Sequence, residues 1–422
     1  ATTAGAYRAF LRHNQLDGVL RDLTHALSRG ERSLHDVGSE LRRAIRHGRF
    51  PDDIADAIRA GYQELSRRYD VRALSVAVRS SATAEDLPEA SFAGQQETYL
   101  NVRGPEELLE ACRRCFASLF TIRAINYRNE HRFDHLKVAL SVGVQRMVHA
   151  DRAGAGVMFS LDTETGFPDL VVINASWGLG ETIVQGSVDP DEYRVFKPRL
   201  DERELVPILG KRLGGKEQKL VYADHGAQTT RLLETSHAER RRFVLSDPEI
   251  LTLARWAVAI ERHYGKAMDI EWAKDGETGE LFCVQARPET VQSQVKSGAL
   301  KTFSLQERGE VLATGAAIGQ GIASGRVKIL HHPSEMVRFQ DGDVLVTERT
   351  DPDWGPIMKR AAAIVTEHGG RTSHAAIVSR ELGVPAVVGA ARATTALEEG
   401  GEVTVSCAEG IEGRIYRGAL RF

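Results

Sequence analysis

A polar, irregular stretch from Glu289 to about Leu312 divides this 422-residue chain into two parts of different composition. The stretch lacks both helical and strand periodicity, which is typical of a linker. The chain is also longer than the roughly 250–300 residues at which a single hydrophobic core stops growing. We therefore expect separate domains at residues 1–289 and 313–422, joined by a hinge at residues 290–312.

The hydrophobic patterns of the two parts predict a multidomain α+β or α/β fold. The first seventy residues have helical spacing, and short β-rich segments alternate with helices after them. The second part is rich in glycine, valine and alanine and contains short strands throughout. In the first part we expect helices at Pro105–Asn129 and Pro248–Tyr264 and strands at Val138–Val148, Gly154–Leu161, Leu170–Ala175 and Tyr193–Phe196. In the second part we expect strands at Arg326–Leu330, Asp343–Val346, Ala363–Val365, Ala386–Val388 and Glu402–Ser406.

The charge balance argues against two classes of partner. Fifty-five Lys and Arg residues against 58 Asp and Glu give a formal net charge of −3, so no global field attracts nucleic acid or an anionic membrane. No apolar run is long enough to span a membrane, and residues 1–30 lack the apolar core of a signal peptide. We therefore expect a cytoplasmic protein whose anion sites are local.

Cys112 and Cys115 form a C-x-x-C pair, a pattern found in redox and zinc sites. Both follow helical spacing with Leu108, Phe116 and Leu119, which places the thiols on the apolar face of a helix. No second Cys or His pair follows at metal-ligand spacing. We therefore predict that both thiols are buried core groups.

A β-hairpin is predicted shortly before the linker. Side chains alternate along a strand, so Asp269 and Glu271 share a face of the first strand, and Gln285 and Arg287 share a face of the second. If the register pairs Glu271 with Gln285, the other two residues pair as well, which leaves a five-residue loop at Gly276–Glu280. Carboxylate and amide oxygens suit Mg²⁺ carrying nucleotide phosphates, and a guanidinium neutralises phosphate charge. A solvated sheet face with a cross-strand ion pair is the alternative.

His374 follows a buried-type strand and a diglycine loop, and a helix that ends near Gly383 begins next to it. Backbone N–H groups and the helix dipole at that position would stabilise an anionic group on the imidazole. A neutral imidazole is nucleophilic near pH 7 and is able to accept a phosphoryl group. A histidine that caps the helix or packs in the core is the alternative.

Two further segments suggest a ligand site, and the first of them suits the approach of the backbone to a phosphate. Small hydroxyl residues at Ser80–Thr83 follow a short strand, and Trp177–Glu181 places glycines beside an acid at a strand end. A tight turn is the more frequent explanation of the second segment. The sequence contains no Walker lysine motif and no dinucleotide glycine fingerprint, which argues against the two commonest nucleotide folds.

Together these segments resemble the phosphoenolpyruvate synthases, relatives of the pyruvate phosphate dikinases and the rifampin phosphotransferases. The resemblance covers nearly the whole chain and rests on Ala77–Thr98, Ser176–Glu181, Asp269–Lys274, Gln285–Thr290 and Gly369–Ala376. It implies an ATP-grasp nucleotide-binding domain followed by a swivelling β/β/α phosphohistidine domain. It also implies that ATP, pyruvate and water give phosphoenolpyruvate, AMP and phosphate through a phosphorylated histidine.

The resemblance also implies roles for individual residues. His374 matches the phosphorylated histidine, and Glu271 with Gln285 matches the pair that holds Mg²⁺. Thr372 matches a threonine modified by a regulatory kinase and phosphorylase, where a phosphate would block the site by charge and bulk. The implied contacts to the nucleotide and its phosphates are Arg79, Arg123, Glu181, Asp269 and Arg287, with Gln145 and Met147 at the adenine edge.

Three departures from the family pattern bear on activity. The family places a glycine-rich segment with an ATP-binding lysine before the position of Ala1 and a pyruvate-binding barrel after that of Phe422. We therefore expect this chain to perform only the histidine-phosphorylation half-reaction. Ser373 stands where close relatives often carry cysteine, a small polar exchange that the dikinase relatives tolerate. Two alternatives stay open: a related phosphotransferase, such as a rifampin-inactivating enzyme, and a non-catalytic remnant that binds nucleotide.

Overall fold

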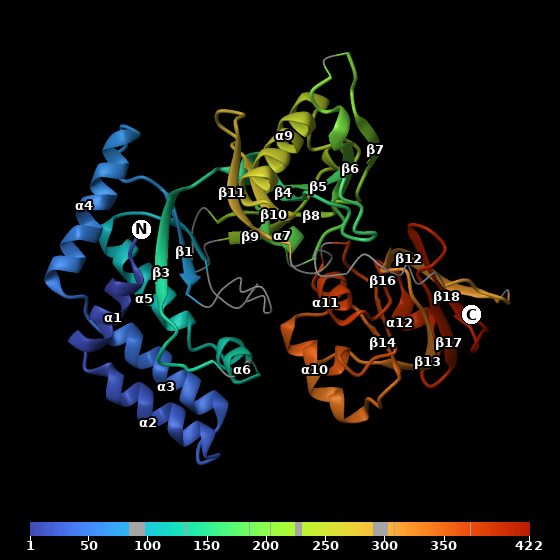
Figure 1. The fold of residues 1–422 in the computed structure, drawn as a ribbon, viewed down its shortest axis with the longest axis horizontal. Coiled ribbons are helices and arrows are strands. Elements are labelled where there is room, and N and C mark those ends of the chain that lie inside the picture. The colour runs from blue at the N-terminus through green and yellow to red at the C-terminus, as the bar shows by residue number, and fades with distance from the viewer. Residues whose placement is uncertain are drawn as a thin grey trace. The chain divides into compact units, whose positions relative to one another are not determined.

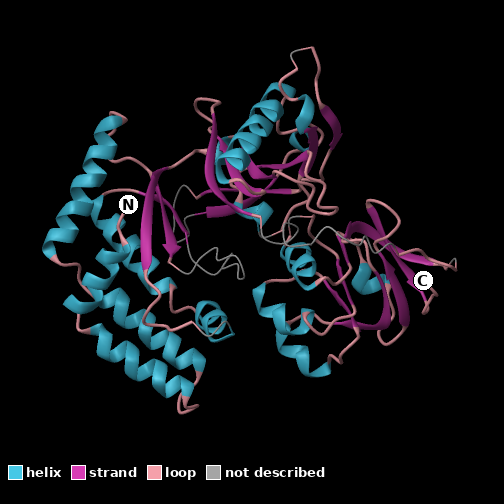
Figure 2. Ribbon diagram, viewed as in Figure 1, coloured by secondary structure: helices cyan, strands magenta, loops and turns pink. Residues whose placement is uncertain are grey.

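The computed structural model describes residues 1–83, 98–130, 133–184, 186–202, 204–223, 230–289, 303–307, 309–371 and 373–422. The chain forms two compact units, Ala1–Met147 and Val148–Phe422. Each unit combines helices with strands (Figure 1, Figure 2), which confirms the mixed α+β class predicted from the sequence. Within the described residues, no helix is both long enough and apolar enough to cross a membrane.

The first unit packs helices against a three-stranded antiparallel sheet of order β2-β1-β3. Its helices are α1 (Ala4–His13), α2 (Leu16–Ser28), α3 (Leu34–His47), α4 (Asp52–Arg68), α5 (Pro105–Ser118) and α6 (Ile122–Glu130). Its strands are β1 (Val76–Ala82), β2 (Thr98–Val102) and β3 (Leu140–Arg146). Helices and sheet share one core, in which Phe10, Phe116 and Val78 have no exposed surface.

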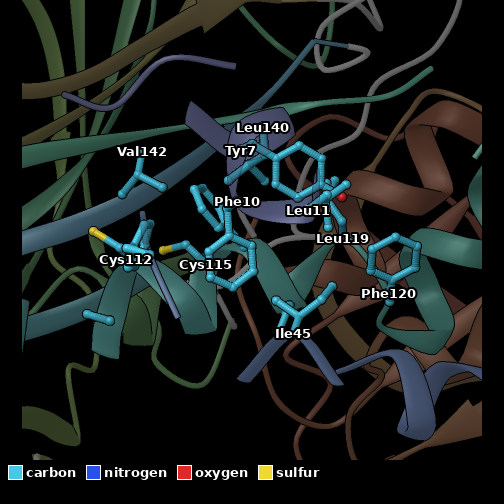
Figure 3. Close-up of a cluster of buried hydrophobic side chains, with 14 of the residues drawn as sticks. Tyr7, Phe10, Leu11, Ile45, Cys112, Cys115, Leu119, Phe120, Leu140 and Val142 are labelled. Atoms are coloured by element: carbon cyan, nitrogen blue, oxygen red, sulfur yellow. The ribbon is translucent and has the colours of Figure 1, made fainter. Parts of the chain in front are cut away.

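Cys112 and Cys115 belong to this core. Figure 3 shows both thiols among Phe10, Val142 and the other apolar side chains of the first unit. Neither cysteine has any exposed surface, and burial raises the pKa of Cys112 to about 12, so its thiol stays protonated and unreactive. The prediction of two core cysteines is confirmed.

The single helix predicted for Pro105–Asn129 is wrong, because two helices occupy this segment. Helix α5 ends at Ser118, and α6 begins at Ile122. The hydroxyl of Thr121 accepts the backbone N–H of Ala124 at 3.2 Å, as an N-cap does. A new helix therefore starts inside a stretch whose hydrophobic period looks continuous.

The second unit contains a six-stranded antiparallel sheet of order β11-β10-β4-β5-β6-β7. The strands are β4 (Gly154–Phe159), β5 (Leu170–Trp177), β6 (Asp191–Phe196), β7 (Ile208–Arg212), β10 (Met268–Lys274) and β11 (Leu281–Pro288). A hairpin of β8 (Gln218–Tyr222) and β9 (Thr230–Glu234) and helices α7 (Glu181–Val184), α8 (His237–Arg240) and α9 (Asp247–Tyr264) accompany it.

Helix α9 covers one face of this sheet. It begins at a capping box formed by Ser246 and Glu249 and ends at Gly265, whose left-handed backbone suits glycine. Leu253 and Ile250 of α9 are fully buried in one cluster with Ile270 of the sheet. The opposite face of β10 and β11 is thus left to the polar residues of the predicted hairpin.

A closed barrel forms the rest of the second unit, in strand order β12-β16-β15-β14-β13-β17-β18. Its elements are β12 (Val311–Ile318), β13 (Ile322–Ile329), β14 (Val344–Thr347), α10 (Gly355–Met358), β15 (Ala363–Thr366), α11 (His374–Leu382), β16 (Ala386–Val388), α12 (Ala393–Ala396), β17 (Glu402–Ser406) and β18 (Glu412–Arg417). The five predicted strands are present, and β12 and β18 were missed. Gly315 and Gly413 face each other in these two strands, and a Cβ on Gly413 would lie only 2.6 Å from Val387. Glycine is needed there, yet it weakens a sequence-based strand prediction.

Candidate active site

The polar hairpin of β10 and β11 has the register predicted from its alternation. Asp269 lies opposite Arg287, and Glu271 lies opposite Gln285. The Nε and Nη2 atoms of Arg287 lie 2.8 and 2.7 Å from Oδ2 of Asp269. Ile270, between the two acids, has no exposed surface and packs toward α9. All four polar side chains therefore belong to one face of the sheet.

The predicted loop of this hairpin is wrong by one residue. A β-bulge shifts the register between Glu271 and Trp272, so the loop is Asp275–Glu280 and not Gly276–Glu280. The carboxylate of Asp275 accepts two backbone N–H groups of the loop, at 2.9 and 3.0 Å, and closes the turn. Side-chain alternation carries no signal for such an extra residue.

Burial and charge act in opposite directions on Asp269. Its side chain is 13% exposed, and burial raises the pKa of its carboxyl, while the neighbouring Arg287 guanidinium opposes that rise. Glu271 and Gln285 are half-buried and form the next residue pair on the same face of the sheet. The face thus offers a carboxylate and an amide oxygen, which suit a phosphate-bound cation, beside an arginine that suits the phosphate.

Helix α7 packs on this same polar face. Val157 of β4 pairs with Glu271 of β10, and paired residues of neighbouring strands point to one side. Val157 packs against Ile183 of α7 in a small cluster that also holds Val188. Glu181 is the first residue of α7, so the structure brings it to the sheet face that carries the four polar hairpin residues.

His374 is the first residue of α11, one position before the predicted helix start at Ala375. The preceding Ser373 caps the helix by accepting the backbone N–H of Ala376 at 3.3 Å, so the histidine ring is not the cap. The ring is partly exposed, and its Nδ1 lies 3.0 Å from the hydroxyl of Thr350. Both alternatives considered for this histidine, a cap and a core residue, therefore fail.

The loop before His374 lies against the end of α7. A Cβ placed on Gly186 would overlap the Cβ of Ser373 and lie 3.5 Å from the backbone nitrogen of His374. Gly186 has a φ of +64°, a backbone conformation that favours glycine. The histidine helix consequently begins next to the element that covers the polar hairpin face.

Two of the predicted contacts of the first unit, Arg79 and Gln145, lie on its sheet. Arg79 of β1 pairs with Gly143 of β3, two residues from Gln145, so Arg79 and Gln145 share a face. Met147 follows β3, is 7% exposed and donates its backbone N–H to Ser75 at 2.9 Å.

Three predictions fall wholly or partly outside the described residues. Arg123 lies in α6, but its side chain is not described. Thr372 is not described, and neither is most of the predicted hinge, residues 290–302 and 308.

Thr350 is a candidate site residue that the sequence analysis missed. It is 7% exposed and lies between β14 and α10, 24 positions before the histidine that it contacts. Its sequence neighbourhood carries no periodic or glycine signal that points to the imidazole. Thr350 and His374 become neighbours only when the barrel folds.

Comparison with known proteins identifies the family of both parts. Residues 1–307 match the family described as pyruvate phosphate dikinase, AMP/ATP-binding domain. Residues 339–410 match the mobile domain of the PEP-utilising enzymes.

Among curated relatives, the phosphoenolpyruvate synthases of Synechocystis sp. and Aquifex aeolicus are 52% and 51% identical to this chain over its whole length. That of Escherichia coli is 50% identical. The chain spans 53%, 50% and 53% of these three relatives, so it is about half their length. A solved solution structure of Enzyme I (nEIt) is 33% identical over 19% of this chain and 33% of its own, with a TM-score of 0.17.

Proposed function

The chain belongs to the family of pyruvate phosphate dikinase AMP/ATP-binding domains, and from this premise we propose that it phosphorylates His374 at the expense of ATP. The half-reaction converts ATP, water and His374 into AMP, inorganic phosphate and phosphohistidine. In the complete protein, the phosphohistidine would then donate to pyruvate and give phosphoenolpyruvate, the product named in the relatives.

One spatial relationship supports this proposal most strongly. The helix that begins at His374 starts beside Gly186, just after α7, and α7 packs on the face that carries Glu271. The proposed nucleophile and the proposed phosphate-binding groups of the hairpin thus belong to one compact unit. Phosphoryl transfer depends mainly on such positioning and on charge stabilisation.

Glu271 and Gln285 would hold a Mg²⁺ ion that travels with the nucleotide. The described residues contain no group of three or more His, Cys, Asp or Glu that could form a complete metal site. Magnesium bound to ATP needs only one or two protein oxygens, since phosphates and water supply the rest, and the donor set fits that requirement. When bound, the ion would neutralise charge on the phosphates.

Other residues would bind the nucleotide. In the second unit, Asp269 orients Arg287, which would neutralise phosphate charge, and Glu181 adds a further contact from α7. In the first unit we assign Arg79 and Arg123 to the phosphates, and Gln145 and Met147 to the adenine edge. These assignments rest on the family resemblance and, for Arg79 and Gln145, on their shared sheet face.

Thr350 would select the reacting nitrogen of His374. If Nδ1 carries the proton and donates it to the Thr350 oxygen, Nε2 presents its lone pair to the phosphorus. Transfer forms the Nε2–P bond and breaks a phosphoanhydride bond, and water takes the other phosphoryl group. The helix N-terminus then stabilises the anionic product.

The same proposal covers the domain plan and the partners. We assign the nucleotide domain to residues 1–289, the hinge to residues 290–312 and the phosphohistidine domain to residues 313–422. The carrier would deliver its phosphoryl group to a pyruvate-binding barrel, and modification of Thr372 by a regulatory kinase and phosphorylase would control it. We place the protein in the cytoplasm.

Labelled ATP tests the proposal directly. The protein is incubated with Mg²⁺ and either β- or γ-labelled ATP, and bound label is tested for acid and base stability. We expect acid-labile, base-stable label from only one of the two nucleotides, because the other phosphate leaves as inorganic phosphate. Label in neither experiment would favour the non-catalytic remnant. His374→Ala is expected to bind nucleotide normally and to take up no label.

A further inference from the structure

The histidine helix α11 is held at its far end as well as at its start, and we propose that the ion pair of Glu164 with Arg380 is a latch for the docked carrier. The inference rests on the proposed function, since it concerns how His374 is kept beside the nucleotide face. The latch would be closed while the carrier is docked and open when the carrier leaves. Glu164 and Arg380 are therefore positioning residues, not catalytic ones.

The two partners of the latch come from different parts of the second unit. Glu164 lies in the turn between β4 and β5 of the six-stranded sheet, and Arg380 lies in the last turn of α11. Oε1 of Glu164 pairs with Nη2 of Arg380, and Oε2 accepts the backbone N–H of Gly319 at 3.0 Å. One carboxylate thus binds both α11 and the turn between β12 and β13.

The latch is almost excluded from solvent. The side chains of Arg380 and Glu164 are only 6% and 11% exposed. The turn that carries Glu164 is itself fixed, because Asp162 accepts the backbone N–H of Glu164 at 3.1 Å and the hydroxyl of Thr165 at 2.9 Å. A buried ion pair of this kind fixes the relative orientation of the two elements that it joins. Loss of one partner leaves the other charge buried and unpaired.

The position of Arg380 explains how a remote pair can orient the imidazole. Helix α11 has nine residues, with His374 first and Arg380 in its last turn. The six-residue separation corresponds to about 9 Å along a rigid helix axis. Fixing Arg380 while Gly186 abuts the start of the helix restrains both ends of α11.

A second charged contact supports the docked arrangement on the other side of His374. An Nη atom of Arg371 lies 3.8 Å from Oε1 of Glu192 on β6, and these side chains are 11% and 8% exposed. Arg371 also donates to the backbone oxygen of Ile411 in the barrel at 3.0 Å. A Cβ on Gly370 would lie 3.1 Å from Pro190, so the loop that precedes His374 packs closely against the segment before β6.

Two variants test the latch and the close fit separately. Glu164→Gln removes the charge of the latch but keeps an oxygen for the N–H of Gly319. Gly186→Ala places a methyl group into Ser373 and blocks close docking. Gly265→Ala is the matched control, because Gly265 has nearly the same φ, +67° against +64°, but no atom within 4 Å of an added Cβ.

Docking is measured without nucleotide, by the distance distribution between two spin labels. The labels are attached at Leu209→Cys in the sheet and Val337→Cys in the barrel, where the parent residues are 65% and 93% exposed. The exposed Cys283 is replaced by serine in every protein, and the remaining three cysteines are buried. The rate of histidine labelling from ATP and the Kd for ATP are measured in parallel.

We expect a narrow distribution for the parent and Gly265→Ala, and a broad one for Glu164→Gln and Gly186→Ala. In these two variants the labelling rate should fall about tenfold to hundredfold, while the Kd for ATP is unchanged. The exchanged pair Glu164→Arg with Arg380→Glu should recover part of the loss that either change causes alone.

Parent-like distances in Glu164→Gln would overturn the latch, whatever Gly186→Ala and the labelling show. Broadened distances with no histidine label in any protein, the parent included, would leave the latch in place and overturn the proposed function instead.

Discussion

The hydroxyl of Thr350 lies 3.0 Å from Nδ1 of His374, across 24 residues of sequence. Because a histidine that donates from Nδ1 presents Nε2 as its nucleophile, we predict that Thr350→Val slows phosphorylation by about tenfold. Thr350→Ser keeps the hydroxyl and should retain most of the rate. Nitrogen NMR of the ring should show a shifted tautomer balance in the valine variant alone. An unchanged balance in Thr350→Val would show that the contact does not set the tautomer.

The polar hairpin predicts a metal-dependent loss of nucleotide affinity. Glu271→Gln removes a charged ligand but preserves the shape of the side chain opposite Gln285. We expect the Kd for Mg²⁺-ATP to rise about tenfold to hundredfold, as loss of a charged contact does, with little change for metal-free ATP. Titration calorimetry in both conditions measures the difference. Equal losses with and without Mg²⁺ would mean that Glu271 does not bind the metal.

The ion pair of Lys216 with Asp191 predicts a large effect on stability. Neither side chain has any exposed surface, and Asp191 also accepts the backbone N–H groups of Gly214 and Val244, each at 2.9 Å. Lys216→Met would leave a buried carboxylate without its cation, which costs about 3–5 kcal/mol. Urea unfolding followed by tryptophan fluorescence is suitable, since all four tryptophans belong to the second unit.

Lys211→Met is the control for that experiment. Lys211 pairs with Asp247 at 2.8 Å, but these side chains are 35% and 49% exposed. Such a pair contributes at most about 1 kcal/mol. Similar unfolding midpoints for the Lys216 and Lys211 variants would contradict the structural role of the buried pair.

His135 predicts that the first unit loses stability in acid. Burial, followed by the nearby Arg128 cation, lowers the pKa of His135 to about 4, and Nε of Arg128 donates to its Nδ1 at 2.8 Å. Below pH 6.5 the unfolded chain takes up a proton that the folded unit refuses until about pH 4, so stability falls as the pH falls through this window.

His135→Asn should flatten this pH dependence, because asparagine does not titrate. Hydrogen exchange of α6 and β3, corrected for the intrinsic effect of pH, measures the local stability of both proteins. The same slope in the variant and the parent would exclude His135 as the source.

Local sequence patterns predict many parts of the candidate site, but they do not predict which distant segments come together. The pairing of Glu271 with Gln285 and the position of His374 close to a helix start both follow from short-range patterns. The bulge after Glu271 does not, because an extra residue in a strand leaves the hydrophobic pattern nearly unchanged. Glu164 and Arg380 are 216 residues apart, and no local rule joins a turn of one sheet to a helix of a barrel.

Mapping the phosphorylated residue tests the central claim most directly. The protein is treated with Mg²⁺-ATP, digested at alkaline pH, where phosphohistidine survives, and sequenced by tandem mass spectrometry. The account predicts one phosphoryl group, on the imidazole of His374. A phosphoryl group on any other residue, with His374 unmodified, would contradict it.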